Sequence, residues 1–266
     1  MSTTKHWRGT QGARDVSTDL TDLARLAVED AIEDEGIVLF NGLSGTGKTF
    51  TLKSIKDDLG GTWFHLPIGP DATGKAFEVE LLEAIYSVKM PGKHVDRRRL
   101  RGDLRFEIAT WLAEGPSVVS VDDFDPSGAA GLTVIRWLFE RPVMHAAFII
   151  VGNDVERLAR KWPAFYSRIM RVVPFKRIPE EAVVEKMKQY HPFFERSQDA
   201  LVLRVDQKYG AGNFRNWALF LECTLKTAAD LGLDHLSNEL IDGVLATLNK
   251  TPGRRGDGPL DDAEAA

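Results

Sequence analysis

The sequence predicts an α/β fold, in which a parallel sheet is flanked by helices and a small helical domain follows. Up to about residue 178, apolar strand-like segments alternate with helix-like segments, which is typical of a parallel sheet covered on both faces. A glycine-rich loop over residues 42–49 lies between a predicted strand and a predicted helix. From Pro179 onwards the patterns are helical only.

The glycine-rich loop matches the phosphate-binding pattern G-x-x-x-x-G-K-[ST]. Residues 36–40 before it form an apolar strand, and residues 50–59 after it carry a helical apolar face. Glycines allow successive backbone N–H groups to converge on phosphate oxygens, while Lys48 is expected to reach the β- and γ-phosphates and Thr49 to offer its hydroxyl to Mg²⁺. The predicted phosphate site consists of Gly42, Leu43, Ser44, Gly45, Thr46, Gly47, Lys48 and Thr49.

The remaining elements follow in order along the chain. Strands are predicted over residues 62–66, 118–121 and 146–151, and helices over about 75–88, 96–113, 131–140 and 155–161. We expect a flexible segment over residues 1–20, a nucleotide-binding domain over 21–178, a helical lid over 179–250 and a disordered tail over 251–266. In the lid, Phe214, Trp217 and Leu221 mark one helical apolar face.

Composition limits the classes of function. The formal charge is −5, from 34 basic and 39 acidic side chains, so a nucleic-acid contact requires a local basic patch. Cys223 is the only cysteine, which excludes an internal disulfide or a cysteine-based metal site and is typical of a reducing cytoplasm. No apolar run approaches membrane-spanning length and the N-terminus lacks a signal-peptide core, so we expect a soluble, cytoplasmic protein without membrane contact.

Two acids follow the apolar strand at residues 118–121. In a parallel sheet the carboxyl end of this strand lies beside the phosphate loop, so Asp122 is expected to organise the Mg²⁺ shell and Asp123 to polarise the attacking water. Paired acids are also common where a strand simply exits into a loop. The upstream phosphate loop favours the catalytic interpretation.

Three further polar residues are candidates for the same chemistry. Asn153 ends the strand at 146–151 and could orient the attacking water, although Gly-Asn-Asp is also ordinary turn chemistry. Arg168 lies among apolar residues, and Arg215 lies at the start of a lid helix. Each arginine, taken singly, is better explained as a surface charge than as a site residue.

Taken in order, these segments resemble a known series of motifs. Residues 42–49, 118–123 and 149–153, Ser167-Arg168 and residues 212–215 are similar to the Walker A, Walker B, sensor 1, arginine finger and sensor 2 motifs of the AAA+ ATPases. The resemblance covers roughly residues 25–248. It implies ATP and Mg²⁺ as ligands, with Arg168 reaching the γ-phosphate of a neighbouring subunit and Arg215 contacting ATP in its own subunit.

Within that family, the compact lid, the Val151-Gly-Asn-Asp154 step and the Ser167-Arg-Ile169 segment are most similar to the transposition-helper ATPases, the phage Mu B and TnsC/TniB group. That resemblance implies ATP-dependent homo-oligomers, rings or helical filaments, on double-stranded DNA. It also implies a transposase partner, with target-site selection and transposase stimulation as the output. Asp123 stands where the family usually has glutamate, so hydrolysis is expected to be slow. We expect no N-terminal helix-turn-helix domain of the kind that Mu B carries, so the core domain would have to contact DNA.

A basic stripe is the candidate DNA contact. Arg97, Arg98, Arg101 and Arg105 are predicted to share one face of the helix over 96–113, and phosphate contacts need such a stripe. A solvated helix face or a subunit contact would give the same pattern. The candidate DNA-binding residues are Lys89, Lys93, Arg97, Arg98 and Arg101, together with Lys75, which the family resemblance places in the loop after the second strand.

Three functions remain open. The first is a DNA-bound AAA+ ATPase that regulates transposition. The second is a replication-initiator, helicase-loading or other remodelling AAA+ ATPase. The third is a monomeric P-loop kinase, which would not need Arg168 in trans. A GTPase is disfavoured because the Asn-Lys-x-Asp motif is missing, and an ABC ATPase because the Leu-Ser-Gly-Gly-Gln signature is missing.

Overall fold

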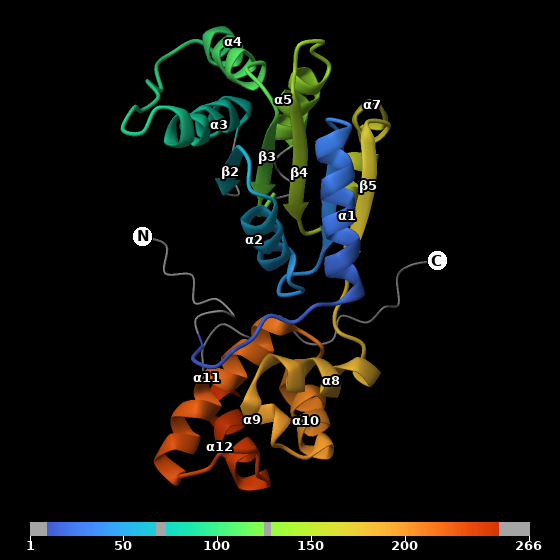
Figure 1. The fold of residues 1–266 in the computed structure, drawn as a ribbon, viewed down its shortest axis with the longest axis vertical. Helices are drawn as coiled ribbons and strands as arrows, with labels where there is room; N and C mark the ends of the chain where they lie inside the picture. The colour runs from blue at the N-terminus through green and yellow to red at the C-terminus, as the bar shows by residue number, and fades with distance from the viewer. Residues whose placement is uncertain (1–9, 68–72, 125–128, 250–266) are drawn as a thin grey trace. The chain divides into compact units, whose positions relative to one another are not determined.

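The computed structural model describes residues 10–67, 73–124 and 129–249, and the chain forms two compact units (Figure 1). The α/β unit extends from Thr18 to Lys176. The helical unit combines the residues up to Ser17 with those from Arg177 onwards. The N-terminal segment therefore belongs to the same unit as the C-terminal helices.

The α/β unit contains a five-stranded parallel sheet in the order β2-β3-β4-β1-β5. Its strands are β1 (Ile37–Gly42), β2 (Trp63–Pro67), β3 (Ser117–Asp122), β4 (Ala146–Gly152) and β5 (Ile169–Phe175). The three central strands β3, β4 and β1 are almost entirely buried, as expected for a parallel sheet covered on both faces. The predicted α/β fold class is thereby confirmed.

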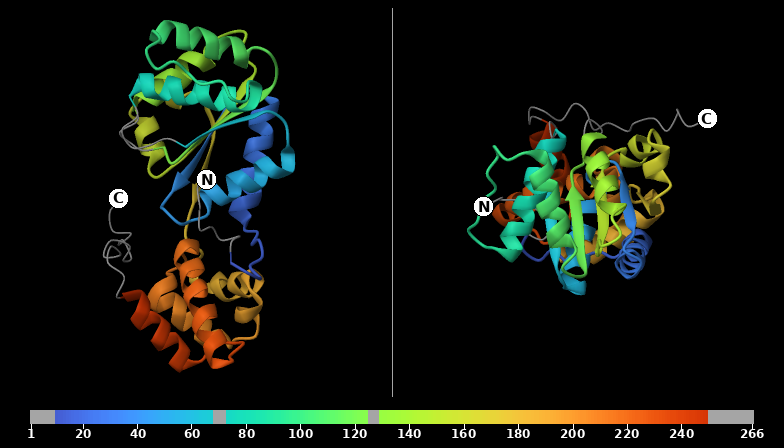
Figure 2. Two further views of the ribbon diagram at one scale, coloured as in Figure 1. Left: turned by 90° about the vertical axis from the view of Figure 1, so that its left-hand side faces the viewer. Right: turned by 90° about the horizontal axis from the view of Figure 1, so that it is seen from above.

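Helices cover both faces of this sheet (Figures 1 and 2). They are α1 (Asp19–Glu33), α2 (Lys48–Leu59), α3 (Gly74–Lys89), α4 (Arg101–Leu112), α5 (Ala129–Phe139), α6 (Val155–Arg160) and α7 (Pro163–Tyr166). Alternate residues of β1 enter two separate cores, because side chains alternate along a strand. Val38 packs with residues of α1 and α2, and Leu39 packs with residues of α3, α4 and α5.

Three local differences from the sequence pattern are found in this unit. Strand β5 was not predicted, because Arg171 and Pro174 interrupt its apolar pattern. Helix α1 was not predicted either; its N-terminus carries a capping box between Thr18 and Thr21. Helix α4 begins at Arg101 rather than at residue 96, because the preceding residues form a turn in which Val95 N donates to the Glu83 carboxylate at 2.8 Å.

The helical unit contains α8 (Glu180–Tyr190), α9 (Pro192–Glu195), α10 (Asp199–Val205), the π-helix η2 (Asp206–Gly210), α11 (Phe214–Leu231) and α12 (Asn238–Asn249). Residues 10–17 attach to it through the main chain. Arg14 N donates to Tyr190 O at 2.8 Å, and His191 Nε2 donates to Gln11 O at 2.9 Å. The predicted tail over 251–266 lies outside the described residues. Among the described helices, none is long and apolar enough to cross a membrane.

Candidate functional site

The glycine-rich loop connects the carboxyl end of β1 to the first turn of α2. Gly45 and Gly47 adopt positive φ angles of 81° and 97°, which glycine reaches without steric cost. At Gly42, an added Cβ atom would lie 2.0 Å from the carbonyl oxygen of Phe175 in β5. The N-cap residue of α2 is Gly47, which makes no side-chain capping hydrogen bond, and a helix N-terminus that follows a glycine-rich loop is a typical site for phosphate.

Lys48 is the first residue of α2 and is buried, with 8% of its surface exposed. Its ammonium donates to Gly42 O at 2.5 Å, to Leu43 O at 2.7 Å and to Asn153 Oδ1 at 3.0 Å. The structure therefore brings Asn153, at the end of β4, to the loop lysine. Asp154 follows in a left-handed conformation with φ of 53°, so the segment is a turn as well.

Thr49, in the first turn of α2, meets Asp122 at the carboxyl end of β3. Thr49 Oγ1 donates to Asp122 Oδ1 at 3.1 Å, and Asp123 N donates to the same oxygen at 3.0 Å. Asp123 has a positive φ of 54°, which turns the chain sharply after β3 and leaves its side chain exposed. The two acids thus differ in environment, since Asp122 is buried and Asp123 faces outward.

Burial raises the pKa of Asp122, and the charge of Asp123 raises it further. The hydrogen bonds from Asp123 N and Thr49 oppose this change. His65 lies in the neighbouring strand and contacts Ser120 Oγ through Nδ1 at 3.0 Å. Burial lowers the pKa of His65, although the Asp122 charge acts to raise it. A desolvated carboxylate of this kind gains stability from a nearby cation.

The donor set fits a magnesium–phosphate group. Mg²⁺ prefers oxygen ligands and is usually held by one or two protein groups together with substrate phosphates and water. The hydroxyl of Thr49 and the carboxylate of Asp122 supply such oxygens, and the Lys48 ammonium supplies a cation for phosphate. Within the described part of the chain, no group of three or more His, Cys, Asp or Glu residues could hold a metal ion by itself.

Solved structures with the same arrangement of elements include the ORC2 protein of Aeropyrum pernix in ADPNP and ADP complexes, with a TM-score of 0.63 and 19% identity over 88% of this chain and 68% of that one. The A. pernix ORC1 protein in complex with DNA gives a TM-score of 0.61, with 16% identity over 88% and 66% of the two chains. The RuvB Holliday junction branch migration motor of Thermotoga maritima also gives 0.61, with 15% identity over 88% and 70%. The chain has the AAA+ ATPase fold. No family model matches it, and neither does any curated protein sequence.

Within the AAA+ fold, Arg168 lies where β5 begins. Its guanidinium donates to Glu140 Oε1 at 3.3 Å and to Ser167 Oγ at 3.0 Å. Gly42, at the start of the glycine-rich loop, pairs with Phe175 at the other end of β5. The strand spans roughly 20 Å at about 3.3 Å per residue, so the geometry separates Arg168 from the loop of its own subunit.

Arg215 lies in the helical unit, in the first turn of α11. Its backbone N–H and that of Asn216 donate to Asn213 Oδ1, which caps the helix. Asp206, which the sequence pattern did not single out, fixes the same turn: its buried carboxylate accepts from Gly212 N at 2.8 Å and from Trp217 Nε1 at 3.0 Å.

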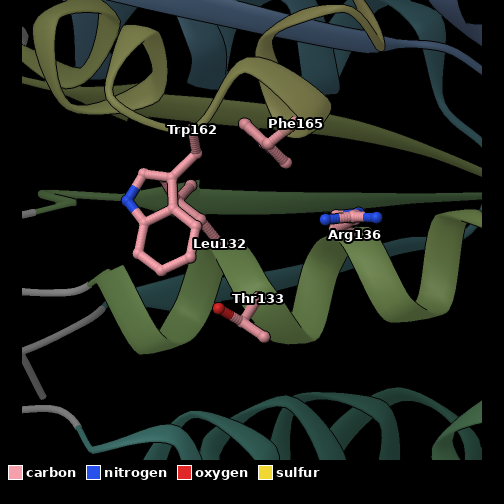
Figure 3. Close-up of a pocket in the computed structure, with 5 residues that line it drawn as sticks. All are labelled: Leu132, Thr133, Arg136, Trp162 and Phe165. Atoms are coloured by element: carbon pink, nitrogen blue, oxygen red, sulfur yellow. The ribbon is translucent and has the colours of Figure 1, made fainter.

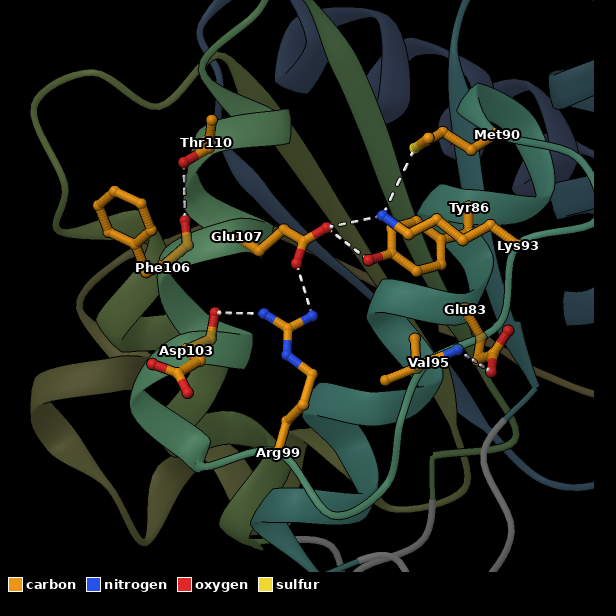
Figure 4. Close-up of polar contacts among 10 residues, drawn as sticks. All are labelled: Glu83, Tyr86, Met90, Lys93, Val95, Arg99, Asp103, Phe106, Glu107 and Thr110. Atoms are coloured by element: carbon orange, nitrogen blue, oxygen red, sulfur yellow. Dashed lines mark hydrogen bonds and ion pairs between the residues drawn. The ribbon is translucent and has the colours of Figure 1, made fainter.

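Most of the cations between residues 89 and 105 are paired with carboxylates of α3, of α4 and of the turn after α4. Arg101 binds the fully buried Glu78 through two hydrogen bonds of 2.9 and 2.8 Å, and Arg105 binds the same carboxylate at 2.5 Å. Glu107 accepts from Arg99 at 2.6 Å, from Tyr86 and from Lys93 at 3.5 Å (Figure 4). The other ion pairs of the stripe are Arg97 with Glu80 and Lys89 with Glu114.

The predicted helical face is therefore wrong in two respects. Arg97 and Arg98 precede α4, and Arg101 and Arg105 face α3 rather than solvent alone. Within the described ranges, no ion pair is found for Arg98 or Lys75. Lys75 lies in the first turn of α3, after residues that fall outside the described ranges.

A small pocket lies between α5 and the start of α7. Its lining residues are Leu132, Thr133, Arg136, Trp162 and Phe165 (Figure 3). It contains no residue of the glycine-rich loop, so it is separate from the candidate nucleotide site. Arg136 donates to Glu140 at 3.0 Å, and Glu140 also accepts from Arg168. Glu140 therefore links Arg136, which lines the pocket, to Arg168.

Asn41 is a further residue that sequence reasoning missed. It lies directly before Gly42, and its Oδ1 accepts from Glu156 N at 3.2 Å, at the start of α6. A polar side chain in the last positions of an otherwise apolar strand is the signal that could have marked it.

Proposed function

We propose that this chain is an ATPase that binds ATP with Mg²⁺, assembles into homo-oligomers and acts on double-stranded DNA. The observation that carries the proposal is the meeting of Lys48, Thr49, Asp122 and Asn153 at the carboxyl edge of one parallel sheet. In open α/β sheets, ligands bind at this edge. The ORC2 structure, which has the same fold, contains ADPNP and ADP.

We assign each residue of the site a separate role in phosphoryl transfer. Mg²⁺, when bound, would neutralise charge on the phosphates, and Thr49 and Asp122 would hold it. Lys48 would neutralise the β- and γ-phosphates. Asp123, whose side chain is exposed beside Asp122, would polarise the attacking water, and Asn153 would orient that water.

We assign Arg168 to the site of a neighbouring subunit. Its separation from the loop of its own subunit by the length of β5 supports this role, since a finger acting in cis would have to lie near its own phosphate loop. Arg215 would contact ATP from the helical unit of its own chain. A monomeric P-loop kinase would need neither assembly nor an arginine in trans.

A role in transposition is the finer proposal. The Val151-Gly-Asn-Asp154 step and the Ser167-Arg-Ile169 segment support it, and the partner would then be a transposase. A replication-initiator or helicase-loader role is the alternative. The likeness of the fold to ORC1 in complex with DNA supports a DNA contact in either role. Stimulation of a transposase by the ATP-bound protein would support the first role, and loading of a helicase without any such stimulation would support the second.

The test of the general proposal is assembly. The purified protein is mixed with a non-hydrolysable ATP analogue, with and without duplex DNA, and its size is measured by light scattering and electron microscopy. We expect oligomers that require the nucleotide and bind DNA irrespective of sequence. A protein that stays monomeric with nucleotide and DNA, and phosphorylates a small molecule, would contradict the proposal.

A further inference from the structure

Two short helices connect the candidate nucleotide site to Arg168. Strand β4 ends at Gly152, Asn153 contacts Lys48, and α6 begins at Val155. Helix α7 then ends at Tyr166, two residues before Arg168. The path from the loop lysine to the arginine is therefore short in sequence, although the two ends lie at opposite edges of the sheet.

Glu156 contacts both ends of this path. Its backbone N–H donates to the side chain of Asn41, the residue before Gly42, at 3.2 Å. Its carboxylate accepts from the Tyr166 hydroxyl at 3.2 Å. Arg160 holds the same carboxylate through two hydrogen bonds of 2.6 and 3.1 Å, and its guanidinium lies 4.9 Å from the centre of the Tyr166 ring.

The start of α6 depends on β1 for its cap. Asp154, in the N-cap position, has a left-handed conformation, and its own side chain makes no capping hydrogen bond. An orphan N–H at a helix start is normally satisfied by a local side chain, and here Asn41 of the neighbouring strand accepts from it. At the other end, the buried Phe165 holds α7 in the core beside Tyr166.

We propose that Glu156 is a positioning residue that couples the nucleotide site of a subunit to the placement of Arg168 in that same subunit, through Asn41 on one side and Tyr166 on the other. The inference rests on the proposed function, because it requires Arg168 to act on a neighbour's nucleotide. A displacement at the end of β1 would move α6 through Asn41, and the hydroxyl of Tyr166 would pass the movement to the residues before Arg168.

The first test compares two tyrosines in one background. Tyr166→Phe removes only the hydroxyl that binds Glu156, and Tyr86→Phe is the matched control, because Tyr86 also donates to a glutamate, Glu107, between α3 and α4. We expect kcat for ATP hydrolysis, measured without DNA, to fall about tenfold in Tyr166→Phe with an unchanged Kd for ATP, since a hydrogen bond to a charged group is lost. Tyr86→Phe should keep the wild-type kcat.

Substitutions of Glu156 test the other side of the same hydrogen bond. Glu156→Ala should reproduce the loss of kcat, whereas Glu156→Gln, which retains an oxygen acceptor, should retain most of the activity.

A mixing experiment separates positioning from simple destabilisation. Tyr166→Phe subunits keep an intact nucleotide site, and Asp123→Asn subunits, which we expect to bind nucleotide but hydrolyse it slowly, keep an intact path from that site to Arg168. Mixed assemblies should therefore hydrolyse ATP faster than the sum of the two separate variants, and a variant that was merely unstable would not be rescued in this way.

The rate of ATP hydrolysis by Arg168→Ala is the reference with which the rate of Tyr166→Phe is compared. If Arg168→Ala is slow and Tyr166→Phe matches wild type, the positioning inference is overturned and the proposed function stands. If Arg168→Ala itself hydrolyses ATP at the wild-type rate, the trans role of Arg168 fails, and the inference fails with it. Slow hydrolysis by Tyr166→Phe without rescue in mixed assemblies would also overturn the inference, because the defect would then be structural.

Discussion

At the scale of single residues, the candidate site depends on two charged groups that the fold takes out of water. Lys48 is held by carbonyl and amide oxygens, and Asp122 by a hydroxyl and a backbone N–H. Burial of a charge costs free energy unless a partner compensates it. A triphosphate with Mg²⁺ carries charges of both signs and would supply a partner to each residue.

Replacing Lys48 with alanine should weaken ATP binding by on the order of 10- to 100-fold, because charge-assisted hydrogen bonds to phosphate are lost. The fold should remain intact. Lys53→Ala is the control, since Lys53 lies on the same helix with an exposed side chain. Binding is measured with a fluorescent ATP analogue, and wild-type affinity in Lys48→Ala would remove the nucleotide assignment.

Single substitutions should distinguish the roles of Asp122 and Asp123. Asp123→Asn should keep nucleotide binding and slow hydrolysis by about 100-fold or more, the usual contribution of a general base. Asp122→Asn should lose Mg²⁺-dependent binding. Because burial disfavours the ionised form of Asp122, its charge costs stability at neutral pH, and Asp122→Asn should unfold no earlier than wild type in a thermal melt. Wild-type hydrolysis by Asp123→Asn would assign water activation to another residue.

At the scale of elements, the sequence predicted those helices and strands whose residues follow a regular apolar pattern. The buried strands β1, β3 and β4 and the loop between β1 and α2 were predictable, because their apolar runs and glycine spacing are local properties. Strand β5 was not, because its stability comes from pairing with β1 rather than from its own alternation. The placement of Asn153 beside Lys48 also followed from the parallel sheet.

The basic stripe shows why the surroundings of a candidate binding residue could not be predicted from the sequence. Counted along the chain, residues 89–105 carry an excess of positive charge. In the fold, carboxylates from α3 and from later in α4 lie against those cations, and Glu78 is fully buried between two arginines. Packing of α3 against α4 therefore changes a candidate binding surface into a set of structural ion pairs, with Arg98 as the exception among the described contacts.

The packing of α3 against α4 should depend on pH through Glu107. Burial acts to raise the pKa of Glu107, but hydrogen bonds from Tyr86 and Arg99 outweigh it and lower the pKa to about 2 from its ordinary value of 4.5. As the pH falls, Glu107 is therefore protonated in the unfolded chain at a higher pH than in the folded chain. The stabilisation of the fold by ionised Glu107 is lost as the pH falls from about 4.5 towards 2.

Urea unfolding of wild type and Glu107→Gln at several pH values measures this contribution. We expect Glu107→Gln to be less stable by on the order of 1–2 kcal/mol at neutral pH, with the difference shrinking in that acidic window. Glu80→Gln, which alters the exposed pair with Arg97, is the control and should change stability by less than about 1 kcal/mol. A difference between wild type and Glu107→Gln that is constant with pH would show that the hydrogen bonds do not depend on the charge.

At the scale of the whole molecule, net charge limits how the protein could hold DNA. With a formal charge of −5, diffuse attraction to phosphate is unfavourable. Affinity would have to come from a few cations repeated along an oligomer, and ATP would build that oligomer. Most cations of the stripe are paired. The residues best placed to contact phosphate are therefore Arg98, for which no ion pair is found among the described residues, and Arg97, whose pair with Glu80 is exposed to solvent, with Lys75 as the next candidate.

We therefore expect DNA binding that requires ATP, is largely independent of sequence and weakens with salt. Each phosphate contact contributes about −0.9 to the slope of log K against log salt, so the double variant Arg97→Glu, Arg98→Glu should flatten the slope by about two units per protomer if both residues touch phosphate. Arg101 is left unchanged, because reversing its charge beside the buried Glu78 would destabilise the fold. Lys188→Glu with Lys226→Glu, both in the helical unit, matches the change in net charge and should leave the slope unaltered.

ATP-dependent assembly without DNA should persist in the Arg97→Glu, Arg98→Glu variant. An unchanged slope with unchanged affinity would exclude both arginines from the DNA contact, and Lys75→Glu would then be the variant to measure.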